Sequence, residues 1–409
     1  MWLVIRARRL GWLVALAGLV ALLAWAGGQG LAPASTYEVR PLLRYYPGYA
    51  DGPPVSARAA ILMDVETGTV LYAKNEHDRL GPASTTKIMT AILALERGDL
   101  DEPVTIGRRP GWVEGSRIYL KRGQVITLRQ LLYGLLMESG NDAAIAIGEY
   151  LYGSEQKFTQ QMTRRAQELG CWNTRFADPH GLSRTYEGHY TTAFDLALMA
   201  RRGLSIPEFS KVVRSRTRTV REPGLPDVSF RNTNRLLWYL AGADGVKTGT
   251  TSEAGYCLVA SANRDGFRLL AVVLDAGDRW RDASTLLEYG FREFQPCLVG
   301  LPGEPVGETR VRWGMARTVP VVPARPVLLV VRRSEESQIT TELAARPLVA
   351  PVRSGDPAGR LLVRQGGELI TSAEVTAALP VARRTLWRML GAGFTALLRL
   401  AVERPPSGS

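Results

Sequence analysis

The chain has 409 residues, 45% hydrophobic and 22% charged, a globular composition that excludes a disordered protein and leaves room for roughly two to three domains. Its net charge is +12, but residues 1–36 carry three arginines, and residues 301–409 carry 15 arginines against 9 acidic residues. Residues 37–300 therefore keep a net charge of only +3, which argues against a nucleic-acid groove there.

The N-terminal segment is typical of an export signal. Three arginines among the first nine residues precede an uncharged apolar run from Leu10 to Ala26, and small-x-small patterns at 24–26 and, more weakly, at 32–34 offer cleavage sites. This order predicts a signal peptide over residues 1–34. The apolar run also reaches the lower length for crossing a bilayer, so an uncleaved anchor stays open. In both cases the rest of the protein lies outside the cytoplasm.

The next segments alternate between strand and helix patterns. The Pro- and Tyr-rich residues 37–56 are expected to form an exposed lead-in, and residues 59–74 a β-hairpin around the turn at 66–68. Further along the chain, the periodicity predicts helices over 85–96, 128–150, 155–169, 191–203 and 280–294, with a second hairpin formed by strands 256–262 and 267–275.

Antiparallel strand pairs thus stand at both ends of a helical region. This order predicts an α/β domain over 37–295, in which an antiparallel sheet takes strands from both chain ends and is flanked by helices. After Pro296 the chain changes to short Val- and Pro-rich runs. We expect a small all-β domain over residues 300–379.

Residues 380–403 form a third unit. On a helical projection Arg384, Arg388 and Arg399 share one narrow stripe, and leucines such as Leu386 and Leu390 lie opposite. This pattern predicts an amphipathic helix at a membrane surface. The alternative is a terminal helix packed on its own domain.

A possible nucleophile lies in Pro-Ala-Ser-Thr-Thr-Lys, residues 82–87, at the start of the first predicted helix. The i, i+3 spacing puts Ser84 and Lys87 on one face, and the helix start offers N–H groups to a developing oxyanion. A lysine whose pKa is lowered by burial or nearby cations can take the serine proton. Alternatively, Ser84 only caps the helix and Lys87 is solvated.

Two further polar motifs follow. Ser139-Gly140-Asn141 is expected at a turn between helices, where the hydroxyl could relay a proton and the amide could hold a substrate carbonyl. Lys247-Thr248-Gly249-Thr250 precedes strand 256–262, where a cation and hydroxyls suit a carboxylate and the glycine lets a ligand approach. Each motif alone could be an ordinary turn or a solvated edge.

Together, S-x-x-K from Ser84, S-x-N from Ser139 and K-T-G from Lys247 occur in the order typical of penicillin-binding proteins and β-lactamases. The chain resembles the low-molecular-weight penicillin-binding proteins, the serine-type D-alanyl-D-alanine carboxypeptidases. The similar segments include PASTTKIMTAILALE, MESGNDAA, DPHGL, HYTTAFDLA, FRNTNRLLW, DGVKTGTTSEAGYCLVASA and LVAPVRSGDPAGRL.

The resemblance implies a transpeptidase/β-lactamase-like fold and removal of the terminal D-alanine from peptidoglycan pentapeptide stems at the outer face of the cytoplasmic membrane. It also implies covalent inhibition by β-lactams, membrane attachment through the C-terminal helix, and no cofactor or metal. The residues that it assigns are Ser84 as nucleophile, Lys87 as base, Ser139 as third catalytic group, Asn141 across the cleft, Lys247, Thr248, Gly249, Thr250 and Arg279 near the substrate carboxylate, and the N–H groups of Ser84 and Thr250 as oxyanion hole.

Other functions stay open on the same motifs. A D,D-endopeptidase would use every residue named above. A β-lactamase is less favoured, because Glu168 and Asn173 are five residues apart, not the four of the class A motif. A non-catalytic penicillin-binding sensor is disfavoured by the intact trio of motifs.

The cysteines and histidines suggest no further chemistry. Cys171, Cys257 and Cys297 form neither a disulfide scaffold nor a zinc spacing, and we expect core thiols. His77, His180 and His189 are scattered, and we interpret them as structural or surface residues.

Overall fold

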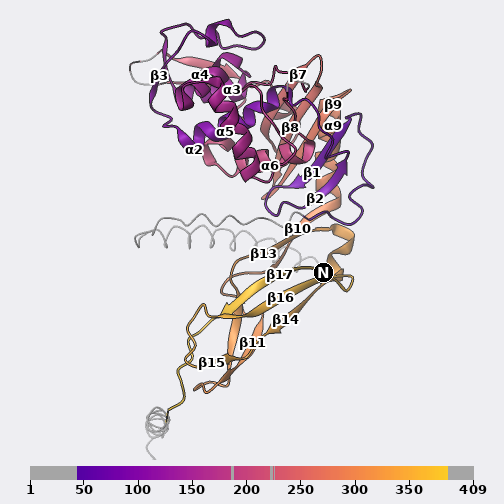
Figure 1. Ribbon diagram of the computed structural model, residues 1–409. Coiled ribbons are helices and arrows are strands. Elements are labelled where there is room, and N and C mark those ends of the chain that lie inside the picture. Colours follow the sequence, from indigo (N-terminus) through magenta and orange to yellow (C-terminus); the bar gives the residue numbers. More distant parts are fainter. Residues whose placement is uncertain (1–43, 186–187, 222–223, 225, 386–409) are drawn as a thin grey trace, which may run out of the picture. The chain divides into compact units, whose positions relative to one another are not determined.

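The computed structural model describes residues 44–185, 188–221, 224 and 226–385 (Figure 1). The predicted signal peptide and nearly all of the predicted terminal helix lie outside these residues. Within the described part, no helix is long and apolar enough to cross a membrane.

A five-stranded antiparallel sheet forms the centre of the first domain. Its strand order is β2-β1-β9-β8-β7, so strands from both ends of the domain pair, as predicted. The pairing of β1 with β9 joins Ile61, near the start of the domain, to Val272, near its end. The strands are β1 (Ala59–Asp64), β2 (Val70–Lys74), β7 (Ala243–Thr251), β8 (Gly255–Arg264) and β9 (Phe267–Ala276).

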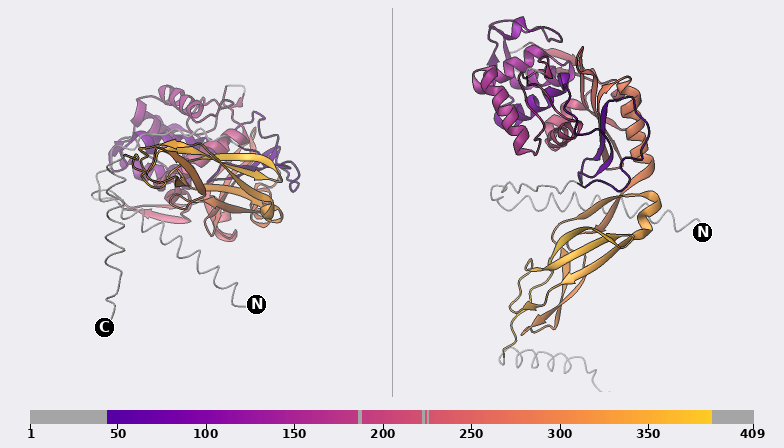
Figure 2. Two further views of the ribbon diagram at one scale, coloured as in Figure 1. Left: turned by 90° about the horizontal axis from the view of Figure 1, so that it is seen from below. Right: turned by 45° about the vertical axis from the view of Figure 1, so that its right-hand side comes forward.

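Helices cover both faces of this sheet, as Figure 1 and the right-hand view of Figure 2 show. Side chains alternate along β1, so its two faces pack against different helices. Ile61 belongs to the core shared with helices α2 to α7, and Leu62 belongs to the core shared with α9. The helices are α2 (Lys87–Arg97), α3 (Leu128–Met137), α4 (Asn141–Tyr152), α5 (Glu155–Glu168), α6 (Ala193–Leu204), α7 (Pro207–Val213), α8 (Leu236–Tyr239) and α9 (Arg279–Glu293).

Two strand pairs lie outside the main sheet, and the sequence patterns did not predict them. They are short, with three or four residues a strand, so the period-2 signal is weak. They are β3 (Pro103–Thr105) with β4 (Val125–Thr127), and β5 (Thr217–Val220) with β6 (Val228–Arg231).

The expectation of an exposed lead-in is wrong for part of residues 44–56. Tyr46 is only 1% exposed, its N–H donates to Val70 O at 2.8 Å, and its ring packs edge-on against Phe294. Val55 is buried as well. Pro and Tyr indicate irregular backbone, but the aromatic ring is large enough to add to the core.

The C-terminal part is all-β, as predicted. A six-stranded sheet has the order β14-β16-β17-β12-β11-β15, and β10 pairs with β13. Valines from both sheets, including Val321 and Val331, share one core. The strands are β10 (Phe294–Gly300), β11 (Gly307–Arg312), β12 (Thr318–Pro323), β13 (Val327–Arg332), β14 (Ile339–Ala345), β15 (Leu348–Val349), β16 (Pro357–Gln365) and β17 (Glu368–Ala377).

The buried carboxylate of Asp282 gives a test of the first domain's stability. It accepts hydrogen bonds from Ser56 N at 3.0 Å, Ser56 Oγ at 2.7 Å and Ala57 N at 2.7 Å. Asp282→Ala leaves two main-chain donors without this acceptor, and we expect a loss of about 3 kcal/mol in the free energy of unfolding, measured in urea. Glu293→Ala, in an exposed pair on the same helix, should change it by less than about 0.5 kcal/mol. Equal effects would contradict this account.

Candidate active site

Ser84 and Lys87 are brought together by a tight turn. Ser84 lies in a 3₁₀ turn (η2, Ala83–Thr86), and the regular helix α2 begins only at Lys87. The predicted helix start at residue 85 is therefore slightly too early, because Ala83 has a φ of 46° and the chain enters through a left-handed residue. Ser84 is not the N-cap residue of either segment, since these residues are Pro82 and Thr86. Its Oγ lies 2.8 Å from Lys87 Nζ.

The Lys87 amine is fully enclosed. Besides Ser84 Oγ, its Nζ lies 2.7 Å from Asn141 Oδ1 and 2.7 Å from His180 O. Burial lowers the pKa of Lys87 well below its usual value and the charge of Lys247 lowers it further, against the carboxylates of Asp178 and Asp142. This environment favours a neutral amine, which can accept the proton of the Ser84 hydroxyl.

A loop that the sequence analysis left without a role supplies one of these acceptors. The carboxylate of Asp178 accepts from His180 N at 2.8 Å and from Gly181 N, which fixes the turn that aims the His180 carbonyl at Lys87. Gly181 has a φ of +94°, and a Cβ there would lie 1.8 Å from Ala83 O, so the turn requires glycine. The Asp-Pro-His-Gly turn was the available signal, but it does not reveal where a main-chain carbonyl points.

Ser139 and Asn141 lie between α3 and α4. Ser139 has a φ of 64° and lines the cavity in front of Ser84. The Asn141 side chain is engaged at both ends, because its Oδ1 contacts Lys87 and its Nδ2 donates to Glu114 O at 2.7 Å. In this arrangement Asn141 contacts the lysine, and its expected contact with a substrate carbonyl stays a prediction.

Strand β7 is the edge of the sheet beside Ser84. Lys247 is 1% exposed, its Nζ donates to Thr248 O at 3.0 Å, and burial, with a contribution from Arg279, lowers its pKa to about 7. A Cβ on Gly249 would lie 3.1 Å from Ser84 N. The small residue expected to admit a ligand therefore also allows the strand to approach the turn that carries Ser84.

Arg279 joins the site from the start of α9. Its Nη1 donates to Thr250 Oγ1 at 2.7 Å and to Gly249 O at 2.6 Å. On the other side, Thr248 Oγ1 lies 2.8 Å from Thr233 Oγ1, a contact that the sequence did not predict. The hydroxyls of Thr248 and Thr250 are thus held by neighbouring side chains.

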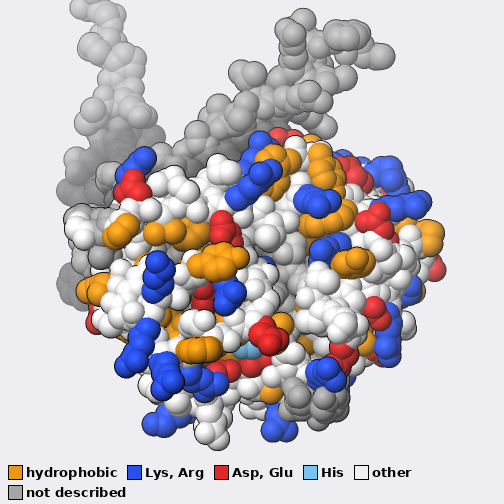
Figure 3. All heavy atoms as spheres, turned by 90° about the horizontal axis from the view of Figure 1, so that it is seen from above, with side chains coloured by type: hydrophobic (Ala, Val, Ile, Leu, Met, Phe, Trp, Pro, Cys, Tyr) orange, Lys and Arg blue, Asp and Glu red, His pale blue; other side chains and the backbone are white. Residues whose placement is uncertain are grey.

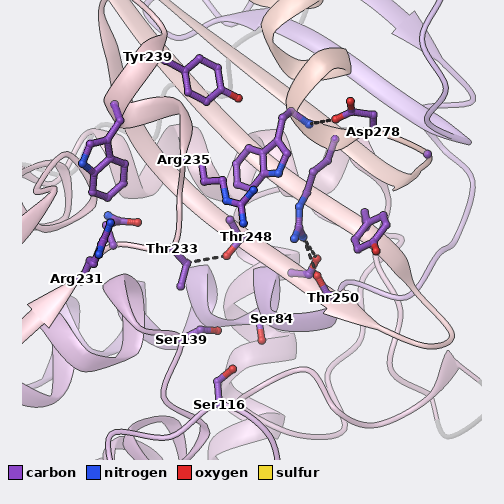
Figure 4. A pocket seen from close by; sticks show the side chains of 17 residues that line it. Ser84, Ser116, Ser139, Arg231, Thr233, Arg235, Tyr239, Thr248, Thr250 and Asp278 are labelled. Atoms are coloured by element: carbon purple, nitrogen blue, oxygen red, sulfur yellow. Dashed lines mark hydrogen bonds between the residues drawn. The ribbon is translucent and has the colours of Figure 1, made fainter.

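These groups surround one cavity of about 910 Å³ (Figure 4). Ser84, Ser139, Thr248, Thr250 and Arg279 line it, while Lys87 and Lys247 are buried behind its wall. Figure 3 shows this face of the molecule, where basic and hydrophobic side chains are mixed along one border of a hollow near the centre of the view. The arrangement combines the hydroxyl of Ser84, the enclosed amines of Lys87 and Lys247, and the guanidinium of Arg279, groups that could support nucleophilic attack and the binding of an anion.

Neither cysteines nor histidines add a group that lines this cavity. Cys171 and Cys257 are buried free thiols, and Cys297 is a half-buried one. His189 Nε2 contacts Thr86 Oγ1 at 2.9 Å, behind the Ser84 turn. Among the described residues, no group of three His, Cys, Asp or Glu side chains could hold a metal ion.

Comparison with known proteins gives matches over both domains. The family model described as D-alanyl-D-alanine carboxypeptidase (peptidase S11) matches residues 48–278, and that of the penicillin-binding protein 5 C-terminal domain matches residues 299–383. The chain is 34% identical to the D-alanyl-D-alanine carboxypeptidase DacF of Bacillus subtilis, over 78% of this chain and 85% of that protein. It is also 34% identical to DacC of Escherichia coli, over 78% and 83%.

Among solved structures, penicillin-binding protein 5 of Haemophilus influenzae is similar, with 30% identity and a TM-score of 0.71 over 81% of this chain and 99% of that one. The predicted fold and family resemblance are therefore confirmed. The domain boundaries at 37–295 and 300–379 and the roles of individual site residues stay predictions.

The buried Lys247 predicts an unusual pH dependence of stability. Its pKa is about 7 in the folded protein and about 10.4 when unfolded, so the unfolded state binds more protons between these values and stability rises with pH. Lys247→Met removes this contribution. We expect the variant to exceed the wild type in melting temperature at pH 7, and this advantage to shrink toward pH 10.

Lys121→Met serves as the control, because Lys121 is an exposed lysine. Its difference from the wild type should stay constant across the same pH range. A Lys247→Met difference that is equally constant would show that Lys247 titrates normally.

Proposed function

The chain belongs to the D-alanyl-D-alanine carboxypeptidase family of serine hydrolases, and from this premise we propose that it is an exported enzyme that removes the terminal D-alanine from peptidoglycan stem peptides. The observation that carries the proposal is the enclosed Lys87 amine, 2.8 Å from the hydroxyl of Ser84. A serine hydroxyl attacks an amide only when a base takes its proton.

For acylation we assign the roles that the family resemblance implies, supported by the contact between Ser84 Oγ and Lys87 Nζ. Ser84 Oγ attacks the carbonyl between the two D-alanines while Lys87 Nζ accepts its proton. The N–H groups of Ser84 and Thr250 stabilise the oxyanion, a contribution of about 10²–10³ in rate for one such donor. The C–N bond then breaks, and Ser139 passes a proton to the leaving amine, which departs as free D-alanine.

The cationic wall binds the terminal carboxylate. Lys247, Arg279 and the hydroxyls of Thr248 and Thr250 are the groups available, and a carboxylate beside Lys247 raises its pKa from about 7, so binding takes up a proton near neutral pH. Water then attacks the ester on Ser84 and releases the shortened peptide. We assign no base to this second step.

The same serine opens the ring of penicillin and forms a covalent adduct. A D,D-endopeptidase would use the same groups on a cross-linked stem, so the two activities differ in what is released. For localisation, we propose the outer face of the cytoplasmic membrane and the cell wall, with residues 1–34 as export signal and residues 380–403 as the membrane-surface helix.

Ser84→Ala tests the nucleophile. The wild type should be labelled covalently by a fluorescent penicillin and should release free D-alanine from a defined pentapeptide, and the variant should do neither, because no hydroxyl remains to form the ester. Gel fluorescence and chromatography measure the two results. Cleavage of cross-linked muropeptides without release of free D-alanine would instead favour the endopeptidase, and an unlabelled wild type would reject the whole proposal.

Lys87→Arg tests the base. A guanidinium keeps the positive charge but stays protonated, so the acylation rate should fall by about 10²–10⁴, the usual contribution of a general base. The rate is measured by stopped-flow with a fluorescent penicillin. Lys121→Arg, on the surface, provides the matched control. Acylation of Lys87→Arg within a factor of three of the wild type would exclude Lys87 as the base.

A further inference from the structure

Exposed apolar side chains gather at one end of the C-terminal domain. They come from the turn between β11 and β12, from β15 and from the residues just after β17. In Figure 1, β15 lies at the end of this domain away from β10. We call this end the tip, and its exposed apolar residues are Trp313, Met315, Val349 and Leu379. No step of the proposed reaction uses them.

Backbone hydrogen bonds hold the three segments of the tip together. The last residues of β11 pair in parallel with β15. In the turn that follows β11, Trp313 O accepts from Arg384 N at 2.7 Å, and Met315 N donates to Ala382 O at 2.9 Å. Residues from distant parts of the sequence therefore meet at the same end of the domain.

Trp313 is not explained by the packing of its own domain. Its side chain is 71% exposed, so the ring adds little to the core. Its φ of 61° is a conformation that costs a bulky residue free energy, and glycine would suit this turn better. A large apolar ring in a strained and exposed position indicates a contact outside the domain.

The chain leaves the domain at the tip. Residues 381–384 belong to the predicted helix over 380–403, but here they are extended, because Val381 bridges to Val352 and Arg383 bridges to Gly314. The predicted start of the helix at residue 380 is therefore too early. Residues 386–409 follow almost directly after the tip in the sequence.

Positive charge accompanies the apolar residues. The segments 312–317, 348–353 and 378–384 contain five arginines and no acidic residue. All five arginines are exposed, and within the described part of the chain Arg312 and Arg317 form no ion pair. Exposed apolar groups beside cations suit a surface that offers both anions and hydrocarbon.

Charge complementarity separates three occupants of such a surface. A second copy of the tip would bring five more arginines, and residues 386–409 of the same chain carry three arginines against one glutamate, so both would add like charge. An anionic bilayer has the opposite charge on its phosphates and an apolar layer just below them, at the level where tryptophan is enriched. The bilayer is therefore the occupant that the tip favours.

We propose that the tip docks on an anionic lipid bilayer, with the Trp313 ring among the headgroups and the arginines on the lipid phosphates. This contact is separate from the predicted terminal helix. It goes beyond the proposed function and takes from it only the location at the outer face of the membrane. Stable attachment to a membrane surface needs more than one weak element, and the domain itself contributes one of them.

Co-sedimentation of the full-length enzyme with vesicles tests the proposal. The vesicles contain phosphatidylcholine with phosphatidylglycerol, and the bound fraction at increasing lipid concentration gives the affinity. Trp313→Gly fits the positive φ and removes only the ring. We expect it to bind about 10-fold more weakly, the order that burial of one large apolar side chain contributes. All variants keep both termini, so differences between them report on the tip.

Two leucines provide a matched pair within the same domain. Leu379, just after the end of β17, is 57% exposed, and Leu369, near the start of that strand, is 50% exposed. Leu379→Ser should weaken binding about 5-fold, and Leu369→Ser should leave it unchanged.

The arginines test the role of charge. Arg312→Gln combined with Arg317→Gln should weaken binding to the anionic vesicles about 10-fold and leave binding to pure phosphatidylcholine vesicles unchanged. Arg325→Gln, in the turn at the other end of β12, should match the wild type on both kinds of vesicle.

Trp313→Gly binding equal to that of the wild type or of Leu369→Ser overturns the docking site. Stronger binding overturns it too, because the ring would then cover residues 386–409. Loss of a dimer without a change in lipid affinity would assign the tip to a second copy. Penicillin labelling in solution should be the same in all variants, and an unlabelled wild type would count against the proposed function and not against the tip.

Discussion

Enclosing the amine of Lys87 is the constraint that arranges the first domain. A buried amine that loses its water needs acceptors from the protein, and here they come from three separate segments: Ser84 in the turn before α2, Asn141 at the start of α4, and the main chain of His180. These three segments of the helical region must therefore meet at one point. A displacement of any of these segments would expose the amine to water and allow its pKa to return toward the usual value.

The same closure requires backbone that most residues avoid. Ala83 and Ser139 both have positive φ, at a cost of order 1–3 kcal/mol each, and Gly181 and Gly249 are glycines because the Ser84 turn leaves little or no room for a Cβ. Such strain persists only where the surroundings fix it. The buried strands β1 and β9 and the helices packed on them supply that rigidity. A stable core is therefore needed to hold the strained residues of the site in place.

Local patterns predicted much of this arrangement, and contacts between distant segments were harder to foresee. Ser84 and Lys87 are one helical turn apart, so their approach follows from sequence spacing alone. The carbonyl of His180 could not be found in this way, because a main-chain acceptor has no residue signature. The same applies to the contact between Thr233 and Thr248, which depends on how the loop before α8 packs on β7, and to Tyr46, whose ring enters a core that only the folded chain defines.

The site needs two electrostatic properties that oppose each other. Lys87 has to be neutral to accept a proton, and the wall around Lys247 and Arg279 has to be positive to hold an anion. The positive wall helps to keep Lys87 neutral, but a bound carboxylate weakens that effect. Asp142 and Asp178 act in the same direction as the bound anion, although their oxygens are committed to main-chain N–H groups of Leu120 and Gly181. Burial has the largest effect on the pKa of Lys87 and does not depend on the ligand's charge, so that anion binding and a neutral base can coexist.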